Sequence, residues 1–248
     1  MASSNLSISR HKGHGAIDGT HDIAVVIDVI RAFTFAKTAF DNGAERILLA
    51  EEVDTAQTLA AVHPDSLLAG EIDALPIDGF DFGNSPAQIA GLDLSGRTLV
   101  HRTSNGTQMA IKALECASHV LVTGLSNAQA TAKEVAYLAE GGANRLLLVA
   151  THPTGDEDVA CGDLLLTLLG QEGGISPDQA FDRTQASEAA GKFLDPTQPE
   201  FPATDMVHVL AMDPPDYAMR VMLEANVPTV RKTFLKNVRP LPPLAGQV

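Results

Sequence analysis

Cations are scarce in this sequence, and their scarcity limits the partners that it can bind. The chain of 248 residues has 17 Lys and Arg against 31 Asp and Glu, a formal net charge of −14 at pH 7. Nucleic acids and anionic membrane surfaces are bound through basic patches, so both are disfavoured as partners. An anionic small molecule stays compatible with this charge, provided that local cations overcome the field of the whole chain.

Cysteines and long apolar runs are scarce as well. Cys116 and Cys161 are too few for a disulfide framework. The first eight residues lack the charged and apolar regions of a secretory leader, and no apolar stretch has the length of a membrane span. These absences predict a cytoplasmic protein with reduced cysteines.

Several common catalytic motifs are missing. The sequence contains no G-x-G-x-x-G, no G-x-x-x-x-G-K-[ST], no H-E-x-x-H and no G-x-S-x-G. Dinucleotide enzymes, P-loop NTPases, zincins and common serine hydrolases are therefore disfavoured. His11, His14 and His21 lie in a Gly-rich polar segment near the start of the chain, and we assign them no functional role.

The sequence does contain a regular alternation of apolar, strand-length runs with helical patterns. Strands are expected at residues 23–29, 46–50, 66–69, 97–100, 119–122, 145–150 and 206–211. Helices are expected at residues 32–42, 53–62, 107–116, 127–140, 163–169, 177–193 and 215–225. This alternation predicts an α/β fold with a largely parallel sheet that helices cover on both faces. Ligands of such sheets bind beyond the carboxyl ends of the strands.

We expect one α/β domain over residues 1–248, with two similar lobes as an open alternative. Residues 70–90 form a long connection rich in Gly, Pro, Asp and Asn, and loops of this length are usually functional. Residues 237–248, with three prolines, are expected to form an extended arm. That arm covers either a sheet edge or a partner subunit in a homodimer.

Two segments whose asparagines lie 22 residues apart have nearly the same pattern. Thr103-Ser-Asn-Gly-Thr107 and Gly124-Leu-Ser-Asn-Ala128 each follow an apolar run and precede an alanine-rich helical pattern. Ser and Asn side chains cap helix N-termini, where unpaired N–H groups and the helix dipole favour an anion. The two segments therefore predict either two ordinary capped helices or an anion site that is built twice.

Acidic side chains follow three of the expected strands. Asp28 closes the most hydrophobic strand, with Arg31 three residues later, and Glu71 follows a shorter one. Glu157 and Asp158 come after a third strand, at the start of a helical pattern. Asp28 and Arg31 are compatible with a structural ion pair, and acids in a first helical turn with a favourable dipole interaction. Together, however, these acids supply the hard oxygen ligands of a Mg²⁺ site.

Six strings carry a family resemblance over most of the chain. They are Asp28-Val-Ile-Arg-Ala32, Ala69-Gly-Glu71, Gly79-Phe-Asp-Phe-Gly-Asn-Ser-Pro86, Thr103-Ser-Asn-Gly-Thr107, Ser126-Asn-Ala128 and Glu157-Asp-Val-Ala-Cys-Gly162. In order and spacing they resemble the 2-phosphosulfolactate phosphatase family, known as ComB. The resemblance implies a three-layer α/β/α phosphatase that uses Mg²⁺ to hydrolyse 2-phospho-3-sulfolactate to 3-sulfolactate and phosphate, a step toward coenzyme M.

The resemblance and the residues together suggest a role for each candidate. The expected metal ligands are Asp28, Glu71, Glu157 and Asp158. The expected phosphate-binding residues are Arg31, Thr103, Ser104, Asn105, Gly106 and Thr107. The carboxylate or sulfonate of the substrate is expected to contact Asn84, Ser85 and Asn127. Asp81 joins Asp28 and Arg31 as a catalytic residue, either as general base or as a second metal ligand, and we favour direct attack by water over a phosphorylated aspartate.

Departures from the family pattern bear on the substrate. Phe33 and Phe35 stand where the family has hydroxyl side chains, His101 and Arg102 replace a threonine-rich run, and Pro153 lies in an altered turn. Phosphoryl transfer is compatible with all of them, whereas they bring recognition of a sulfonate group into question. Two alternatives therefore stay open: a phosphatase for another small phosphorylated hydroxy acid, and a non-catalytic binding protein for a small dianion.

Overall fold

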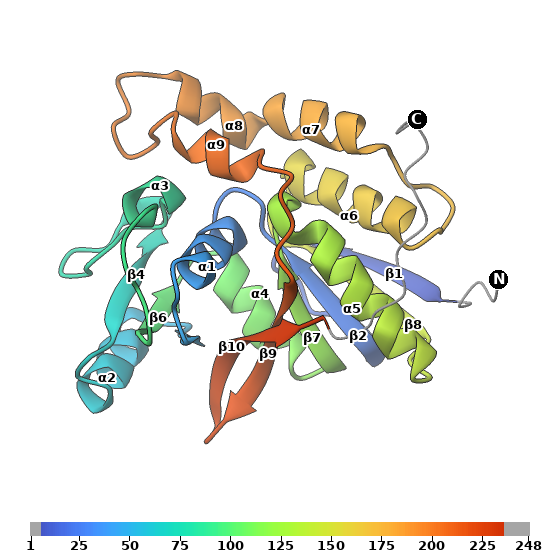
Figure 1. The fold of residues 1–248 in the computed structure, drawn as a ribbon, viewed down its shortest axis with the longest axis horizontal. Helices are drawn as coiled ribbons and strands as arrows, with labels where there is room; N and C mark the ends of the chain where they lie inside the picture. Colours follow the sequence, from blue (N-terminus) through green and yellow to red (C-terminus); the bar gives the residue numbers. More distant parts are fainter. Residues whose placement is uncertain (1–5, 236–248) are drawn as a thin grey trace.

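A sheet of ten strands runs through the protein (Figure 1), in the order β1-β8-β2-β7-β9-β10-β3-β6-β4-β5. The computed structural model describes residues 6–235. The strands are β1 (Ser7–Lys12), β2 (His21–Ile27), β3 (Arg46–Leu49), β4 (Leu67–Ile72), β5 (Leu75–Pro76), β6 (Thr98–Arg102), β7 (Ala117–Thr123), β8 (Arg145–Ala150), β9 (Tyr217–Glu224) and β10 (Val227–Phe234). The α-helices are α1 (Ala32–Asp41), α2 (Val53–Val62), α3 (Pro86–Ile89), α4 (Gly106–Ala113), α5 (Ala128–Glu140), α6 (Asp156–Leu168), α7 (Pro177–Gln185), α8 (Glu188–Gly191) and α9 (Asp205–Val209), and two 3₁₀ turns are η1 (Leu125–Asn127) and η2 (Lys192–Leu194).

Two sets of parallel strands are joined by one antiparallel hairpin. Strands β1, β8, β2 and β7 pair in parallel, and so do β3, β6 and β4. The hairpin β9–β10 pairs antiparallel with β7 on one side and with β3 on the other. Six pairings separate β2 from β4, and the usual twist of about 20–25° at each turns these strands by about 120–150° in total. The twist therefore brings together the carboxyl ends of two strand sets that a flat sheet would place at opposite edges.

Strand β2 shows that helices cover both faces of the sheet. Ile23, Val25 and Ile27 belong to a buried cluster that includes residues of α5 and α6. Ala24 and Val26 belong to another cluster, which includes residues of α1 and α4. Since successive strand residues point to opposite faces, this division confirms the predicted three-layer α/β/α architecture with a mostly parallel, mixed sheet.

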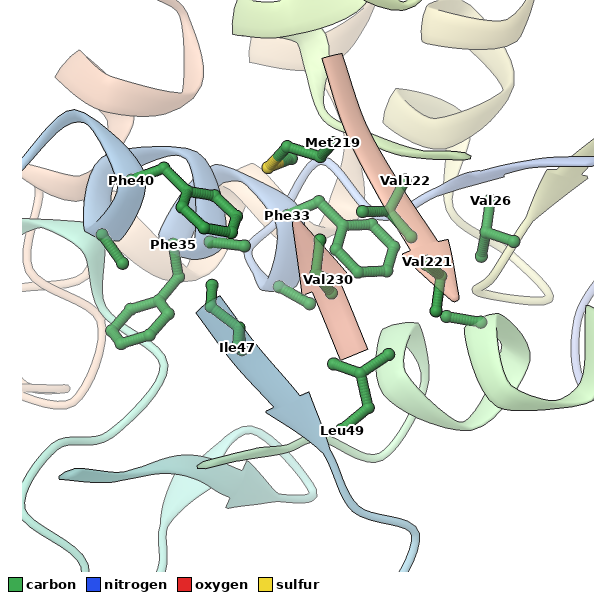
Figure 2. Close-up of a cluster of buried hydrophobic side chains, with 14 of the residues drawn as sticks. Val26, Phe33, Phe35, Phe40, Ile47, Leu49, Val122, Met219, Val221 and Val230 are labelled. Carbon is green, nitrogen blue, oxygen red and sulfur yellow. The ribbon is translucent and has the colours of Figure 1, made fainter. Parts of the chain in front are cut away.

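Helix α1 anchors the hairpin to the rest of the sheet. Figure 2 shows Phe33 and Phe40 of α1 pointing toward Met219, Val221 and Val230 of β9 and β10. These side chains are all buried, and burial of each such side chain contributes about 1.5–3 kcal/mol. The aromatic face of α1 therefore holds the strands that connect the two parallel sets.

The C-terminal part of the chain differs from the sequence prediction. Residues 206–211, predicted as a strand, lie mostly in α9, and residues 215–225, predicted as a helix, form β9. Strand β9 is rich in the helix formers Ala, Met, Leu and Glu, and its pairing with β7 and β10 overrides that propensity. Strands β1 and β10 were not predicted. The predicted arm at residues 237–248 lies outside the described residues.

Two further predictions need correction, and one is confirmed. The helix expected at 177–193 is broken into α7, α8 and η2, because the Ser187 side chain accepts a hydrogen bond from the Ala190 N–H and starts a new helix. The helical pattern expected to start at Glu157 and Asp158 and the helix expected at 163–169 form one helix, α6, so these two predictions are confirmed. The connection 70–90 is more ordered than expected and contains β5 and α3.

Figure 1 shows α7, α8 and α9 as a layer beside α1, α3 and α6.

Two expectations from composition are confirmed. Cys116 and Cys161 are free thiols. No helix within residues 6–235 is both long enough and apolar enough to cross a bilayer.

Candidate active site

A cavity of about 430 Å³ lies where the segments that follow β2, β4, β6 and β8 meet. One wall comes from residues 188–201, which carry α8 and η2. Eight of the predicted site residues line it: Asp28, Arg31, Glu71, Asn84, Ser104, Asn105, Glu157 and Asp158. The cavity thus joins strand ends from both parallel sets of the sheet.

Three helices begin at this cavity. The Ala32 N–H at the start of α1 donates to Asp28 Oδ1 at 3.0 Å. At the start of α4, Gly106 lies so close to Asp28 that a Cβ there would fall 2.7 Å from Oδ2. The first turn of α6 contains Glu157 and Asp158. Helix N-termini carry partial positive charge, so this arrangement stabilises both the buried acids and an anionic ligand.

Asp28 and Asp158 are buried and share one hydroxyl group. Thr151 Oγ1 lies 3.2 Å from Oδ2 of each carboxyl group, and a hydroxyl has only one proton to donate. Burial raises the pKa of Asp28 to about 7, with Glu71 and Glu157 adding to the shift. Burial, followed by the charges of Asp28 and Glu157, also raises the pKa of Asp158 well above its ordinary value. Each carboxyl group therefore keeps its proton to a higher pH than an exposed one, because the surrounding protein compensates a negative charge there poorly.

Glu157 adds an unpaired oxygen to this pair. Its Oε2 is buried and has no hydrogen-bond partner among the described residues, and burial raises the pKa of its carboxyl group. Glu71, in contrast, is well satisfied, because it accepts from the N–H groups of Ser104 and Ala74, each at 2.6 Å. Glu71 therefore holds the loop after β6, while Glu157 keeps an oxygen for a ligand.

The acids of the cavity supply some, but not all, of the ligands that a hard cation needs. Over residues 6–235, no three His, Cys, Asp or Glu side chains are gathered as a ready-made metal centre. Mg²⁺ commonly takes one or two carboxylates and fills its other positions with water and substrate oxygens. The orphaned Glu157 oxygen and the under-compensated Asp28–Asp158 pair suit that mode of binding.

Arg31 is held in place by a buried carboxylate that the sequence prediction did not include. Its Nη1 donates to Asp205 Oδ2 at 2.8 Å, and its Cζ lies 5.2 Å from the ring centroids of both Phe193 and Phe201. Asp205 is fully buried and also accepts from the Ser85 hydroxyl at 2.6 Å. Ser85 therefore helps to position Arg31 and does not line the cavity.

Asn84 is oriented by His101. The two side chains share a hydrogen bond of 3.1 Å between His101 Nε2 and Asn84 Oδ1. Burial lowers the pKa of His101 to about 3, and its Nδ1 has no partner among the described residues. The neutral ring therefore carries its proton on Nε2 and donates it to Asn84, whose amide nitrogen is left for the cavity.

The first Ser–Asn segment meets the cavity through Ser104 and Asn105. Helix α4 is capped by the two threonines of the segment, since the Thr107 N–H donates to Thr103 Oγ1 at 3.0 Å and the Thr103 N–H donates to Thr107 Oγ1 at 2.8 Å. Asn105 makes no side-chain capping bond. Its amide group is therefore available to a ligand.

The second Ser–Asn segment does not reach the cavity. Asn127 is fully buried, and its Oδ1 accepts from the Gly124 N–H at 2.8 Å. The structure therefore gives no support to an anion site that is built twice or to a substrate contact by Asn127. Thr103, Gly106 and Thr107 likewise shape the first segment without lining the cavity.

Asp81 also lies outside the cavity lining. Its exposed carboxylate accepts from the Leu68 N–H at 2.8 Å and so ties its loop to β4. The predicted roles of general base and second metal ligand have no geometric support. Phe33 and Phe35 are buried in the core, so these departures from the family pattern leave the cavity lining unchanged.

Several lining residues escaped the sequence prediction. Thr151 and His152 directly follow β8, and this position after a strand is a signal that would have found them. His14, to which we assigned no role, also lines the cavity. Lys192 and Phe193 come from the irregular segment after α8, where no local pattern predicts their position.

The fold defines an α/β protein in which strand-end carboxyl groups, Arg31 and the starts of α1, α4 and α6 surround one cavity. Residues 10–201 match the family model described as 2-phosphosulpholactate phosphatase. A probable 2-phosphosulfolactate phosphatase of Bacillus subtilis is 38% identical over 232 residues, which cover 93% of this chain and 100% of the relative. Relatives of the same description in Deinococcus radiodurans and Thermus thermophilus are 36% and 35% identical, over 64% and 65% of this chain and 73% and 69% of their own length.

The chain belongs to the 2-phosphosulpholactate phosphatase family. It is accordingly an enzyme of the phosphoric monoester hydrolase class, whose substrate is a small phosphorylated molecule. The resemblance stated from the sequence motifs is thereby confirmed.

Proposed function

We propose that this enzyme hydrolyses 2-phospho-3-sulfolactate to 3-sulfolactate and phosphate with the help of Mg²⁺, a reaction of the coenzyme M biosynthesis type. The names of the relatives support this substrate. The free cysteines are compatible with the reducing cytoplasm, where we propose that it acts.

The acidic character of the residues that line the cavity is the observation that supports a bound metal ion. Its acidic lining residues are Asp28, Glu71, Asp73, Glu157, Asp158 and Glu188, and its fixed cations are Arg31 and Lys192. Asp205 already pairs with Arg31. A substrate with phosphate, carboxylate and sulfonate groups would be repelled by this lining unless a divalent cation accompanied it. Mg²⁺ bound by Glu157 with Asp28 or Asp158 would neutralise phosphoryl oxygens and stabilise the leaving alkoxide.

The residues of the chain would position the reacting groups. Asn105 at the start of α4, together with Arg31, would donate hydrogen bonds to the phosphoryl oxygens. The neighbouring Ser104 donates both its N–H and its hydroxyl proton to Glu71, which holds this turn in place. The amide nitrogen of Asn84 would donate to a second acid group of the substrate. These donors are held by Glu71, Asp205 and His101, so little reorganisation is needed at the moment of reaction.

Direct hydrolysis requires one water molecule and no further reactant. The water oxygen forms a bond to phosphorus as the ester P–O bond breaks, and one water proton ends on the hydroxyl group of sulfolactate. We assign the passage of that proton to whichever of Asp28 and Asp158 does not bind Mg²⁺, since both line the cavity and Asp81 does not.

Phosphate release by the purified protein tests the proposal. We expect Mg²⁺-dependent release that is fastest from 2-phosphosulfolactate and slower from 2-phospholactate, phosphoglycolate and 4-nitrophenyl phosphate. Glu157→Gln should lower kcat by about 100-fold or more and raise the Mg²⁺ concentration needed for half-maximal rate, because it removes a charged oxygen from the cavity. Glu140→Gln, on the exposed end of α5, is the matched control and should behave as the wild type.

Each alternative gives a different result. Full activity after chelation would exclude the metal requirement, and a clear preference for a substrate without sulfonate would identify another phosphorylated hydroxy acid. Tight binding of all esters with release from none would contradict hydrolysis altogether.

A further inference from the structure

Two cations share one aromatic ring on the wall of the cavity formed by residues 188–201. Lys192 Nζ lies 5.5 Å from the ring centroid of Phe201, and Arg31 Cζ lies 5.2 Å from the same centroid. Phe193 packs against Phe201 edge to face, with centroids 5.5 Å apart. Phe193, Phe201, Arg31 and Lys192 all line the cavity. Cation–π contacts hold both positive groups at this wall.

The two cations differ in how they are neutralised. Arg31 pairs with the buried Asp205 and also donates to the Glu200 carbonyl at 3.0 Å. Lys192, in contrast, makes no ion pair and no side-chain hydrogen bond with any residue that the structure describes. Its charge and its three N–H donors are therefore free for a ligand in the cavity.

The local helix geometry explains why Lys192 is unpaired. Glu188 lies four residues earlier, the spacing at which Glu and Lys pair on an α-helix. Helix α8 ends at Gly191, and the chain continues from Lys192 as the tighter 3₁₀ turn η2. This change of pitch removes the α-helical alignment of residues 188 and 192. Lys192 lies over the Phe201 ring instead.

The proposed substrate needs a cation beyond those that bind the phosphate. Besides the phosphate ester, 2-phosphosulfolactate carries a carboxylate and a sulfonate, and Asn84 is a neutral donor. We propose that Lys192 binds one of these two acid groups and thereby determines substrate specificity, an inference that rests on the proposed function. Lys192 would recognise the second acid group of the substrate while the phosphate lies near Ser104 and Asn105.

Substrates that each lack one acid group test this assignment. We would measure kcat and KM for wild type and Lys192→Gln with three esters: 2-phosphosulfolactate, 2-phospholactate, which lacks the sulfonate, and the phosphate ester of 2-hydroxyethanesulfonate, which lacks the carboxylate. Lys192→Gln should lower kcat/KM for 2-phosphosulfolactate by about 10–100-fold, mainly through KM, because a hydrogen-bonded charge pair is lost. The loss should shrink to about twofold or less for the ester without the group that Lys192 binds.

Two further variants control the measurement. Lys192→Arg keeps the positive charge and should restore most of kcat/KM. Lys133→Gln removes the same charge from α5, outside the cavity lining, and should match the wild type on all three esters. Thermal melting should give the same Tm for all variants within about 1 °C, since Lys192 is exposed.

The outcomes separate the inference from the proposed function. An equal loss on all three esters, or no loss on any, would overturn the role of Lys192 while leaving the phosphatase activity intact. Absence of phosphate release from all three esters by the wild type would overturn the proposed substrate, and this inference with it.

Discussion

The segments around Asn105 and Asn127 have nearly the same sequence and opposite environments. Asn105 makes no side-chain cap and lines the cavity. Asn127 is fully buried and accepts a hydrogen bond from the Gly124 N–H. A Ser–Asn pair at the start of a helix is therefore compatible with a ligand-binding role and with a purely structural one, and its neighbours decide between them.

The flanking residues explain the difference. In the first segment, Thr103 and Thr107 cap α4 through their hydroxyl groups, and this leaves Asn105 free. Leu125 occupies the position equivalent to Thr103 and offers no hydroxyl. The cap in the second segment therefore depends on Asn127, which cannot serve a ligand as well.

The residue after each asparagine differs too, and it gives the prediction with the largest effect. Ala128 stands where the first segment has Gly106. In Gly106→Ala, the new Cβ would fall 2.7 Å from both Asp28 Oδ2 and Ala32 Cβ, which is too close for either contact. We expect the Asp28 carboxylate to be displaced and kcat for phosphate release to fall by about 100-fold or more.

The reverse substitution is the control for this prediction. Ala128→Gly should cost about 1 kcal/mol of stability or less and leave kcat/KM unchanged, because Ala128 does not line the cavity. Wild-type kcat in Gly106→Ala would show that the close approach of α4 to Asp28 is not needed for activity.

A smaller effect on activity is expected from Asn105→Ala. Loss of one hydrogen bond to a charged phosphoryl oxygen should reduce kcat/KM by about 10–100-fold. The Tm should stay within about 1 °C of wild type, since the threonine caps are untouched. Steady-state kinetics and thermal melting on the same preparation check both parts. A lower Tm with unchanged kinetics would make Asn105 a structural cap like Asn127.

The same contrast shows what the sequence predicts well. The acids at the strand ends reach the cavity because their position follows from topology, since carboxyl ends of strands meet where ligands bind. Asp28, Glu71, Glu157 and Asp158 were predicted on that basis. Apart from β5 and α3, the alternation of strands and helices from β2 to α6 follows from the sequence because apolar runs and helical patterns alternate regularly there.

The parts of the fold and of the cavity that the sequence did not predict depend on contacts between segments that are far apart in the chain. Strand β9 contains helix formers and is a strand only because β7 and β10 pair with it. Asp205 and Phe201 contact Arg31 although they are far from it in the sequence, with Arg31 and Asp205 separated by 174 positions. Local patterns carry no information on such approaches, so this wall of the cavity was not predicted.

The smallest effect on activity, and the clearest on stability, is expected from Asn127→Ala. The substitution leaves the Gly124 N–H without its partner in a buried position. An unsatisfied buried donor costs about 1–3 kcal/mol, and each kcal/mol lowers Tm by about 2–4 °C in a chain of this size. Denaturant unfolding should show that loss, while kcat/KM measured well below the new Tm stays within about twofold of wild type. A large loss of kcat/KM in fully folded protein would mean that the buried cap at Asn127 supports the cavity from a distance. In that case the contrast between a ligand-binding segment at Asn105 and a purely structural segment at Asn127 would be wrong.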